Sequence, residues 1–270
     1  MTVPNALILT PLRFTSTSQV IRVTANSVTT DLTITVVVGR DYWLSGDGTA
    51  DGVGNVNGEG DFLALVATAL DTHAELSSSS VTIDSEYRVV ITTTSTASVA
   101  LEWSHVNTTL DPTFLGFVAS DVTDASAPFQ ITSPNIPQGL WAPAMPLGVD
   151  GRDRQPITGG VARTVSGLPR VSRIATPLPE RTLMMDLINQ SKILDEYVAS
   201  SDPYGSFEYN WINSISLGRN FRLYEDEADR TTGATFSVYQ TRTLTDPLER
   251  AQQFNVLWSA TLGVVLIEAV

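Results

Sequence analysis

The feature that most constrains the fold of this sequence is a block in which one amphipathic helix is followed by a run of short strands. A Gly/Asp-rich stretch at 45–60 leads into Asp61, a residue type that readily caps the first turn of a helix. Apolar residues then recur at helical spacing, at Phe62, Leu65, Val66, Ala69 and Leu70. This spacing predicts a helix over 61–76 with one face toward a core. β-Branched runs follow at 80–84, 87–93 and 98–105, and such runs are typical of strands.

The chain on both sides of this block also favours strands. Ahead of the helix, strands are predicted at 5–9 and 18–24, and residues 31–44 are predicted to form one strand that is buried on both faces at its centre. The second half indicates a hairpin, a strand, two helices and three further strands. These elements are expected at 160–178, at 180–190, near 190–200 and 205–217, and over 221–226, 234–242 and 252–269. The order of helix and strands therefore recurs, without a repeat of individual residues.

These patterns predict a fold that is mainly β with a few helices, of the α+β class. We expect two β-sandwich or barrel-like blocks, each carrying one or two amphipathic helices. The first would occupy residues 1–118 and the second residues 159–270. The stretch between them, 119–158, is rich in Pro, Gly, Asp and Ser, which predicts an extended connector. We expect this connector to lie along a surface, either that of its own chain or that of a neighbouring subunit.

The charge balance makes direct nucleic-acid binding an unfavourable interpretation. The formal net charge is −13, from 29 acidic and 16 basic residues, and such a surface repels a phosphate backbone. The exception is the stretch 152–181, which holds six of the arginines. The chain has no cysteine, so disulfides and thiolate metal sites are excluded. No apolar run reaches the roughly 20 residues of a membrane span, and the N-terminus lacks the pattern of a signal peptide. We therefore expect a soluble protein that binds no membrane.

Few residues of the sequence are candidates for a catalytic or metal-binding role. Oxygen ligands that Ca²⁺ prefers occur in the Gly/Asp-rich stretch, at Asp47, Asp51, Asn55, Asn57, Glu59 and Asp61. Their spacing fits neither an EF-hand nor a nonapeptide repeat, so an exposed loop is favoured while a calcium site stays open. His73 and His105 lack the spacing of a zinc helix and are interpreted as structural. The carboxylates at 225–229 are adjacent in a predicted turn, where solvation is their usual role. We predict no catalytic residue, no metal and no cofactor.

The candidate interface residues are one tryptophan and four arginines. Four of the five tryptophans have apolar neighbours in predicted helices or strands, which indicates core packing. Trp141 lies instead between Pro137 and Pro143 in the predicted connector, and we expect it to anchor an interface. Arginine tolerates interfaces better than lysine, and only one basic residue in the chain is lysine. The predicted interface set is Trp141, Arg152, Arg154, Arg219 and Arg222.

The order of short segments resembles a class of virion proteins of tailed bacteriophages. The segments are SGDG, DFLALVATAL, VTID, VALEWS, TFLGF, LWAP and SFEYNWINSISLGRNFRLYED, with the LGF at 115–117, the Pro-flanked Trp141 and the GRNFRLYED at 218–226 as signatures. Proteins of this class are small β-rich tail or baseplate components that form rings. The resemblance implies a structural protein without catalysis, located in the virion after synthesis in the host cytoplasm. It also implies a homo-oligomer whose other partners are virion proteins.

Two alternatives are kept beside this interpretation. A receptor- or glycan-binding β-sandwich module would place exposed aromatic side chains along a groove. A carbohydrate-active hydrolase would place two carboxylates roughly 5–9 Å apart in a cleft.

Overall fold

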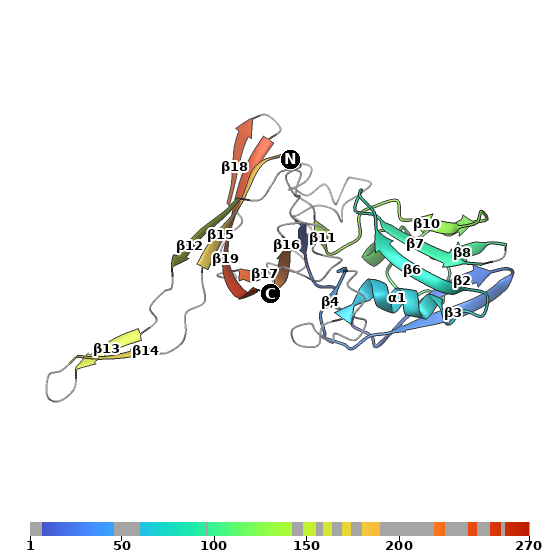
Figure 1. Ribbon diagram of the computed structural model, residues 1–270, viewed down its shortest axis with the longest axis horizontal. Helices are drawn as coiled ribbons and strands as arrows, with labels where there is room; N and C mark the ends of the chain where they lie inside the picture. Colours follow the sequence, from blue (N-terminus) through green and yellow to red (C-terminus); the bar gives the residue numbers. More distant parts are fainter. Residues whose placement is uncertain are drawn as a thin grey trace.

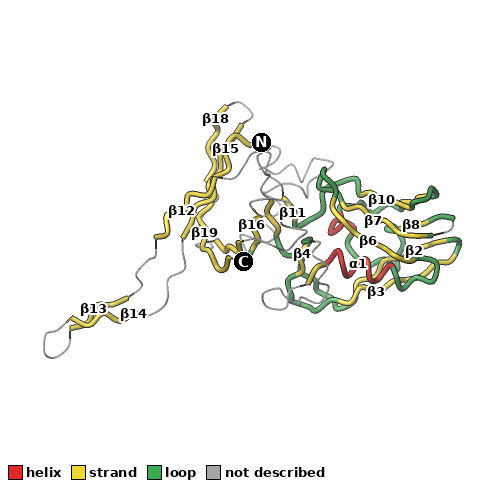
Figure 2. Tube along the Cα trace, in the orientation of Figure 1, coloured by secondary structure: helices red, strands yellow, loops and turns green. Residues whose placement is uncertain are grey.

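The fold is mainly β, as the sequence predicts. The computed structural model describes residues 7–45, 60–95, 97–141, 148–154, 159–163, 169–173, 180–189, 219–224, 237–241, 249–254 and 257–269, and for the strands within 148–189 and 237–269 it describes the backbone alone. This part of the chain contains several antiparallel sheets, one short parallel pair of strands and a single α-helix, which lies beside β3 and β6 (Figure 1). Figure 2 shows that strands dominate both halves of the chain.

Two antiparallel sheets share the core of the N-terminal half. One sheet has the order β3 (Val28–Thr35), β2 (Ser18–Ala25), β8 (Val99–Leu101) and β9 (Val122–Asp124). The other has the order β10 (Phe129–Thr132), β7 (Val89–Thr94) and β6 (Ser77–Ile83). Burial alternates along β2, where Ile21, Val23 and Ala25 are buried, as expected for a strand with one face in a core. Residues of both sheets belong to one buried hydrophobic cluster.

Helix α1 (Phe62–Leu70) contacts the edge strands β3 and β6, one from each sheet. It therefore covers the side on which the two sheets would otherwise be open. Asp61 caps it as predicted, because the carboxylate accepts a hydrogen bond of 3.0 Å from the backbone N–H of Leu63. The buried face consists of Phe62, Leu63, Val66, Ala69 and Leu70, so Leu63 takes the place predicted for Leu65. The helix ends six residues before the predicted boundary, since the chain turns at Asp71 and the following backbone forms short-range turns.

The prediction of one strand over 31–44 is wrong. The structure has β3, then a turn, then the two-residue strand β4 (Tyr42–Trp43). Gly39 adopts a φ of 81° in this turn, which extended backbone does not allow. Val37 and Val38, at the centre of the predicted buried run, are 50% and 51% exposed. Strand β4 instead pairs in parallel with β5 (Gly60–Asp61), directly ahead of the helix.

The two halves of the chain join in one eight-stranded sheet. Its order is β11 (Leu140–Trp141), β1 (Leu7–Leu9), β16 (Phe221–Tyr224), β17 (Ser237–Thr241), β19 (Leu257–Ala269), β15 (Glu180–Asn189) and β12 (Gly148–Arg154), and β18 (Glu249–Phe254) also pairs with β19. Strand β1, near the start of the chain, lies between β11 and β16 with Ile8 opposite both Trp141 and Leu223. The sheet around β1 is therefore completed by β16, a strand more than 200 residues further along the sequence.

The extended connector predicted at 119–158 is not confirmed. This stretch contains β9 and β10 in the two N-terminal sheets, then β11 and β12 in the eight-stranded sheet. Pro128 lies between β9 and β10, and Pro134, Pro137 and Gly139 lie between β10 and β11, where turn residues are expected. The strands β9, β10 and β11 have only two to four residues each, which is too short for periodicity to predict them.

A hairpin extends from the eight-stranded sheet. Strands β13 (Gly159–Arg163) and β14 (Pro169–Arg173) pair with each other as predicted, with Val161 opposite Val171. The chain enters this hairpin from β12 and leaves it toward β15, and β12 and β15 are themselves paired. Figure 1 shows the β13–β14 hairpin standing away from the other described strands.

Several predicted elements lie outside the described residues. These are the helices near 190–200 and 205–217, most of the Gly/Asp-rich stretch at 45–60, and the acidic residues at 225–229.

Candidate functional site

The predicted interface residues do not come together in one patch. Trp141 lies on β11, at one edge of the eight-stranded sheet, and Arg152 and Arg154 lie on β12, at the opposite edge. Six strand spacings of about 4.8 Å separate these two edges, which is roughly 29 Å along the sheet. Arg222 lies on β16 and Arg219 directly ahead of it.

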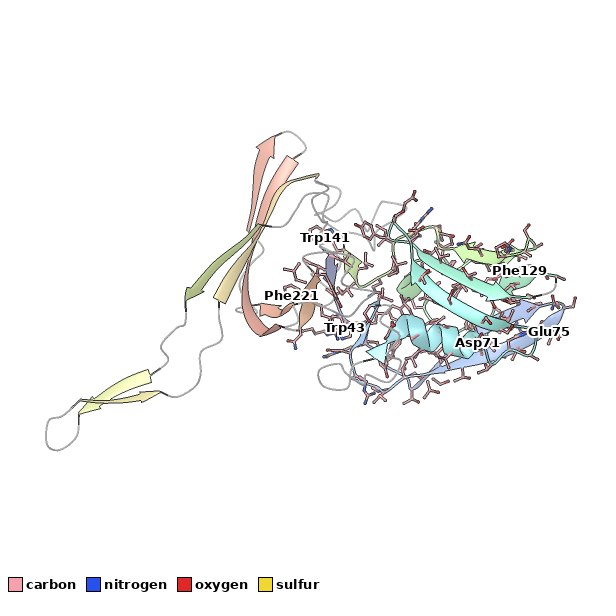
Figure 3. All side chains as sticks on the ribbon, viewed as in Figure 1. Trp43, Asp71, Glu75, Phe129, Trp141 and Phe221 are labelled. Atoms are coloured by element: carbon pink, nitrogen blue, oxygen red, sulfur yellow. The ribbon has the colours of Figure 1, made fainter. Side chains whose placement is uncertain are left out.

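Trp141 is an internal residue. Its side chain is 1% exposed, and it pairs through β11 with Ile8 of β1. Figure 3 shows it near the centre of the molecule, in the same region as Trp43 and Phe221. Within this chain Trp141 therefore has no free face for a partner, and the expectation of an exposed anchor is not met. The prolines that flank it in sequence suggested exposure, whereas the pairing of β11 with β1 decides its burial.

Arg222 is also buried, and it stacks on an aromatic ring. It is 1% exposed, and its guanidinium carbon lies 4.3 Å from the centroid of the Trp43 ring. A cation over the face of an indole is attracted by the ring quadrupole, by about 2 kcal/mol when the pair is desolvated. The contact joins β16 to β4, which are distant in sequence. Arg222 therefore stabilises the junction between the two halves rather than a surface.

Arg219 is half-buried beside an ion pair formed by Arg13 and Asp41. Burial is the main cause that lowers the pKa of Arg219, and the positive charge of Arg13 lowers it further, while Asp41 opposes both. An arginine retains its proton at neutral pH despite such a shift. Two cations and one carboxylate thus meet where β1, β4 and β16 approach one another. This cluster was not predicted, because its members are separated by up to about 200 residues in the sequence.

Arg152 and Arg154 lie on β12, the edge strand opposite to β11 in the eight-stranded sheet. Strand β12 pairs with β15 on one side, and among the described strands it has no partner on the other. Arg154 is opposite Glu180 in this pairing. An edge strand presents unpaired backbone groups, which makes it a natural place for contact with another chain.

Both histidines form hydrogen bonds with backbone groups. His73 is 1% exposed; its Nε2 lies 3.2 Å from the carbonyl oxygen of Val28, and its Nδ1 accepts a hydrogen bond of 3.1 Å from the backbone N–H of Glu75. Both ring nitrogens of His73 are thus occupied. The Nδ1 of His105 accepts from the backbone N–H of Asn107 in a turn. No group of three or more His, Cys, Asp or Glu side chains that could hold a metal ion occurs among the described residues.

Most of the described aromatic side chains lie in the interior, and Tyr87 and Phe114 are half-buried. Trp43, Trp103 and Trp141 are at most 4% exposed, and the large apolar side chains that are exposed are all valines. These are Val28, Val37, Val38, Val106 and Val118. The described surface therefore offers no tryptophan platform on which a sugar ring would stack.

Comparisons with known proteins give no family for this chain. No protein-family model matches the sequence, and no curated protein is similar to it. Among the described residues, no helix is long and apolar enough to cross a membrane.

Proposed function

We propose that this chain is a non-enzymatic structural subunit that assembles with copies of itself into a ring. The resemblance to tail and baseplate proteins of tailed bacteriophages implies that this ring belongs to a phage virion and contacts other virion proteins there. Head-to-tail interfaces between identical subunits close into rings when the rotation between neighbours permits it.

The observation that carries the proposal is the β13–β14 hairpin. Its two strands pair only with each other among the described strands, and it stands away from the sheets (Figure 1). An isolated two-stranded hairpin is marginally stable in water, because it has no third strand or helix on which to bury a face. A chain with such a hairpin is well suited to place it against a neighbouring subunit, which then covers one face of the hairpin.

We regard the sheets β3-β2-β8-β9 and β10-β7-β6, with α1 at their open side, as one sandwich-like block that stays rigid during assembly. Their shared hydrophobic cluster supports this description. A rigid block with an extended hairpin is a suitable unit for a ring.

The test is the native mass of the purified chain, measured by light scattering over a range of concentrations together with negative-stain imaging. We expect a multiple of the 29.1 kDa chain mass and closed rings in the images. A mass of one chain at every concentration would contradict self-assembly and would favour the glycan-binding alternative, which a glycan array then tests.

A further inference from the structure

We propose that the β13–β14 hairpin is an assembly arm that binds the connection between β8 and β9, residues 102–121, on a second copy of this chain. The inference rests on the proposed function and adds to it which two surfaces meet. Three observations carry it. The hairpin pairs with no other described strand, its charge is opposite to that of the rest of the molecule, and the β8–β9 connection has both acidic and apolar residues on its surface.

The charge of the hairpin is opposite to that of the molecule. Residues 159–173 contain three arginines, Arg163, Arg170 and Arg173, and no acidic residue. The first 141 residues contain fourteen acidic and four basic residues. The hairpin is therefore attracted to the N-terminal half of another copy, and like charges keep other pairs of surfaces apart.

Among the described residues, the ion pairs of the N-terminal half leave several carboxylates without a cationic partner. Arg13 pairs with Asp41, Arg22 with Asp31 and Glu102, and Arg88 with Asp84 and Glu86. None of these ion pairs includes Asp111 or Asp121, which are exposed. Asp111 accepts from the backbone N–H of Thr113 at 3.0 Å, and Asp121 from that of Ser104 at 2.8 Å. Both carboxylates are held in place by the backbone and keep lone pairs for an incoming guanidinium.

The same connection carries apolar surface. Val106 is 87% exposed and Val118 is 47% exposed, and both lie between β8 and β9. The hairpin brings Val161 opposite Val171 at the centre of its ladder. A contact of valines surrounded by Arg–Asp pairs has the usual composition of an interface, with an apolar centre and a polar rim. We therefore prefer the β8–β9 connection to other acidic parts of the N-terminal half.

The contact can be mapped directly, because the chain has no cysteine. A photo-crosslinker attached to an Ala162→Cys variant is activated in a one-to-one mixture of ¹⁴N- and ¹⁵N-labelled protein. We expect crosslinked peptides of mixed isotope content that join the hairpin to residues 102–121. The control places the crosslinker at the exposed position of Thr33→Cys on β3, where this pairing should not occur. Crosslinks confined to one isotope, or mixed crosslinks to other segments alone, would overturn the inference.

The role of the positive charges on the hairpin is tested with the triple variant Arg163→Ala, Arg170→Ala and Arg173→Ala. We expect the dissociation constant of self-association at 0.15 M salt to rise about tenfold, since the three positive charges that attract the hairpin to the acidic connection are lost. The matched control, Thr33→Glu, Thr35→Glu and Thr82→Glu, makes the chain more negative by the same amount at exposed positions of β3 and β6 and should leave the constant nearly unchanged. Thermal unfolding of each variant shows whether it still folds.

The outcomes separate this inference from the proposed function. If the wild-type chain assembles and the triple arginine variant assembles equally well, the proposed contact of the hairpin is wrong, while the proposed ring is unaffected. A wild-type chain that stays monomeric refutes both. If the arginine variant keeps its self-association but loses binding to duplex DNA in an anisotropy assay, the arm binds phosphate and a second copy is not its partner.

Discussion

At the scale of single residues, two glycines allow separate segments of the backbone to approach each other closely. Gly116 has a φ of 74°, and a Cβ built on it would lie 2.1 Å from the carbonyl oxygen of Asn135. Gly139 has a φ of 91°, and its Cβ would lie 2.8 Å from the carbonyl oxygen of Thr10. Both positions require glycine because of backbone conformation and because of space. Gly116 is the glycine of the LGF segment at 115–117.

We predict that Gly116→Ala destabilises the protein by more than about 2 kcal/mol, since the added methyl group forces the backbone near Asn135 to move. The matched control is Gly39→Ala, because Gly39 also has a positive φ, of 81°, but has nothing within 4 Å of its Cβ position. The Gly39→Ala substitution should lower the free energy of unfolding by about 1 kcal/mol, because of the backbone conformation alone. Urea denaturation of both variants measures the difference. Equal losses would show that the close contact at Gly116 is relaxed without cost.

Asp124 predicts a pH dependence of stability. Its carboxylate accepts hydrogen bonds from the backbone N–H groups of Gln130, at 2.8 Å, and Ser126, at 3.0 Å. These bonds, that of Gln130 first, hold the pKa of Asp124 below its ordinary value of 3.8. A carboxyl group with a lowered pKa contributes stability above its unfolded pKa, and this contribution is lost as the pH falls through the folded pKa.

We predict that Asp124→Asn is less stable than the wild type at pH 7 and that the difference narrows as the pH falls below about 3.8. The reason is that charge-assisted hydrogen bonds are stronger than neutral ones, and the wild-type carboxyl becomes neutral in acid. Urea unfolding at several pH values measures the difference, and a carboxyl ¹³C titration gives the folded pKa directly. A titration midpoint at or above 3.8 in the folded protein would contradict the prediction.

At the scale of elements, the β2–β3 hairpin turns at Asn26 and Ser27. Both residues have positive φ, of 49° and 68°, and the flanking residues Ala25 and Val28 are opposite each other. A two-residue turn with two positive φ values matches the twist of the strands, and it favours glycine at the second position. Asn26 tolerates this conformation and also accepts a hydrogen bond of 2.7 Å from the backbone N–H of Ala97. Ser27 has no such advantage.

We predict that Ser27→Gly stabilises the protein by roughly 0.5–1 kcal/mol, because glycine removes the steric cost of the left-handed conformation. A rise in the thermal midpoint measures this gain. Ser27→Ala serves as the control, since it removes the hydroxyl group but keeps the Cβ, and it should give no gain. A glycine variant that is no more stable than the alanine variant would show that the turn is not strained.

At the scale of the whole molecule, the two halves of the chain depend on each other. Strand β1 has only three residues and lies between β11, of two residues, and β16. Without β16, the short β1–β11 pair would keep too few partners to cover Leu7 and Leu9, which are both 0% exposed. Arg222 would also leave the face of Trp43. The N-terminal half therefore needs β16, near the end of the chain, to complete its packing.

We predict that a fragment of residues 1–141 unfolds at a lower urea concentration than the full chain and binds a hydrophobic dye. The apolar surface of β1 and the ring of Trp43, which the C-terminal half covers in the full chain, are the expected cause. Dye fluorescence and the urea midpoint from tryptophan emission test it. A fragment with the midpoint of the full chain and no dye binding would mean that the N-terminal half is an independent domain.

The sequence by itself determined the features that depend on neighbours along the chain. The cap at Asp61, the apolar face of α1, the hairpin of β13 and β14 and the mainly β character follow from periodicity, capping and turn residues, which act over a few positions. The break after β3 was missed because Val37 and Val38 look like core residues, whereas Gly39 decides the turn.

Only the tertiary structure decided the features that depend on distant partners. The burial of Trp141 and Arg222 and the meeting of Arg13, Asp41 and Arg219 follow from the pairing of β1 with β11 and β16. A tryptophan flanked by prolines has the same local sequence pattern whether its segment lies on a surface or pairs within a sheet. Which strands become neighbours in a sheet is set by the packing of the whole chain, and no short pattern in the sequence encodes it.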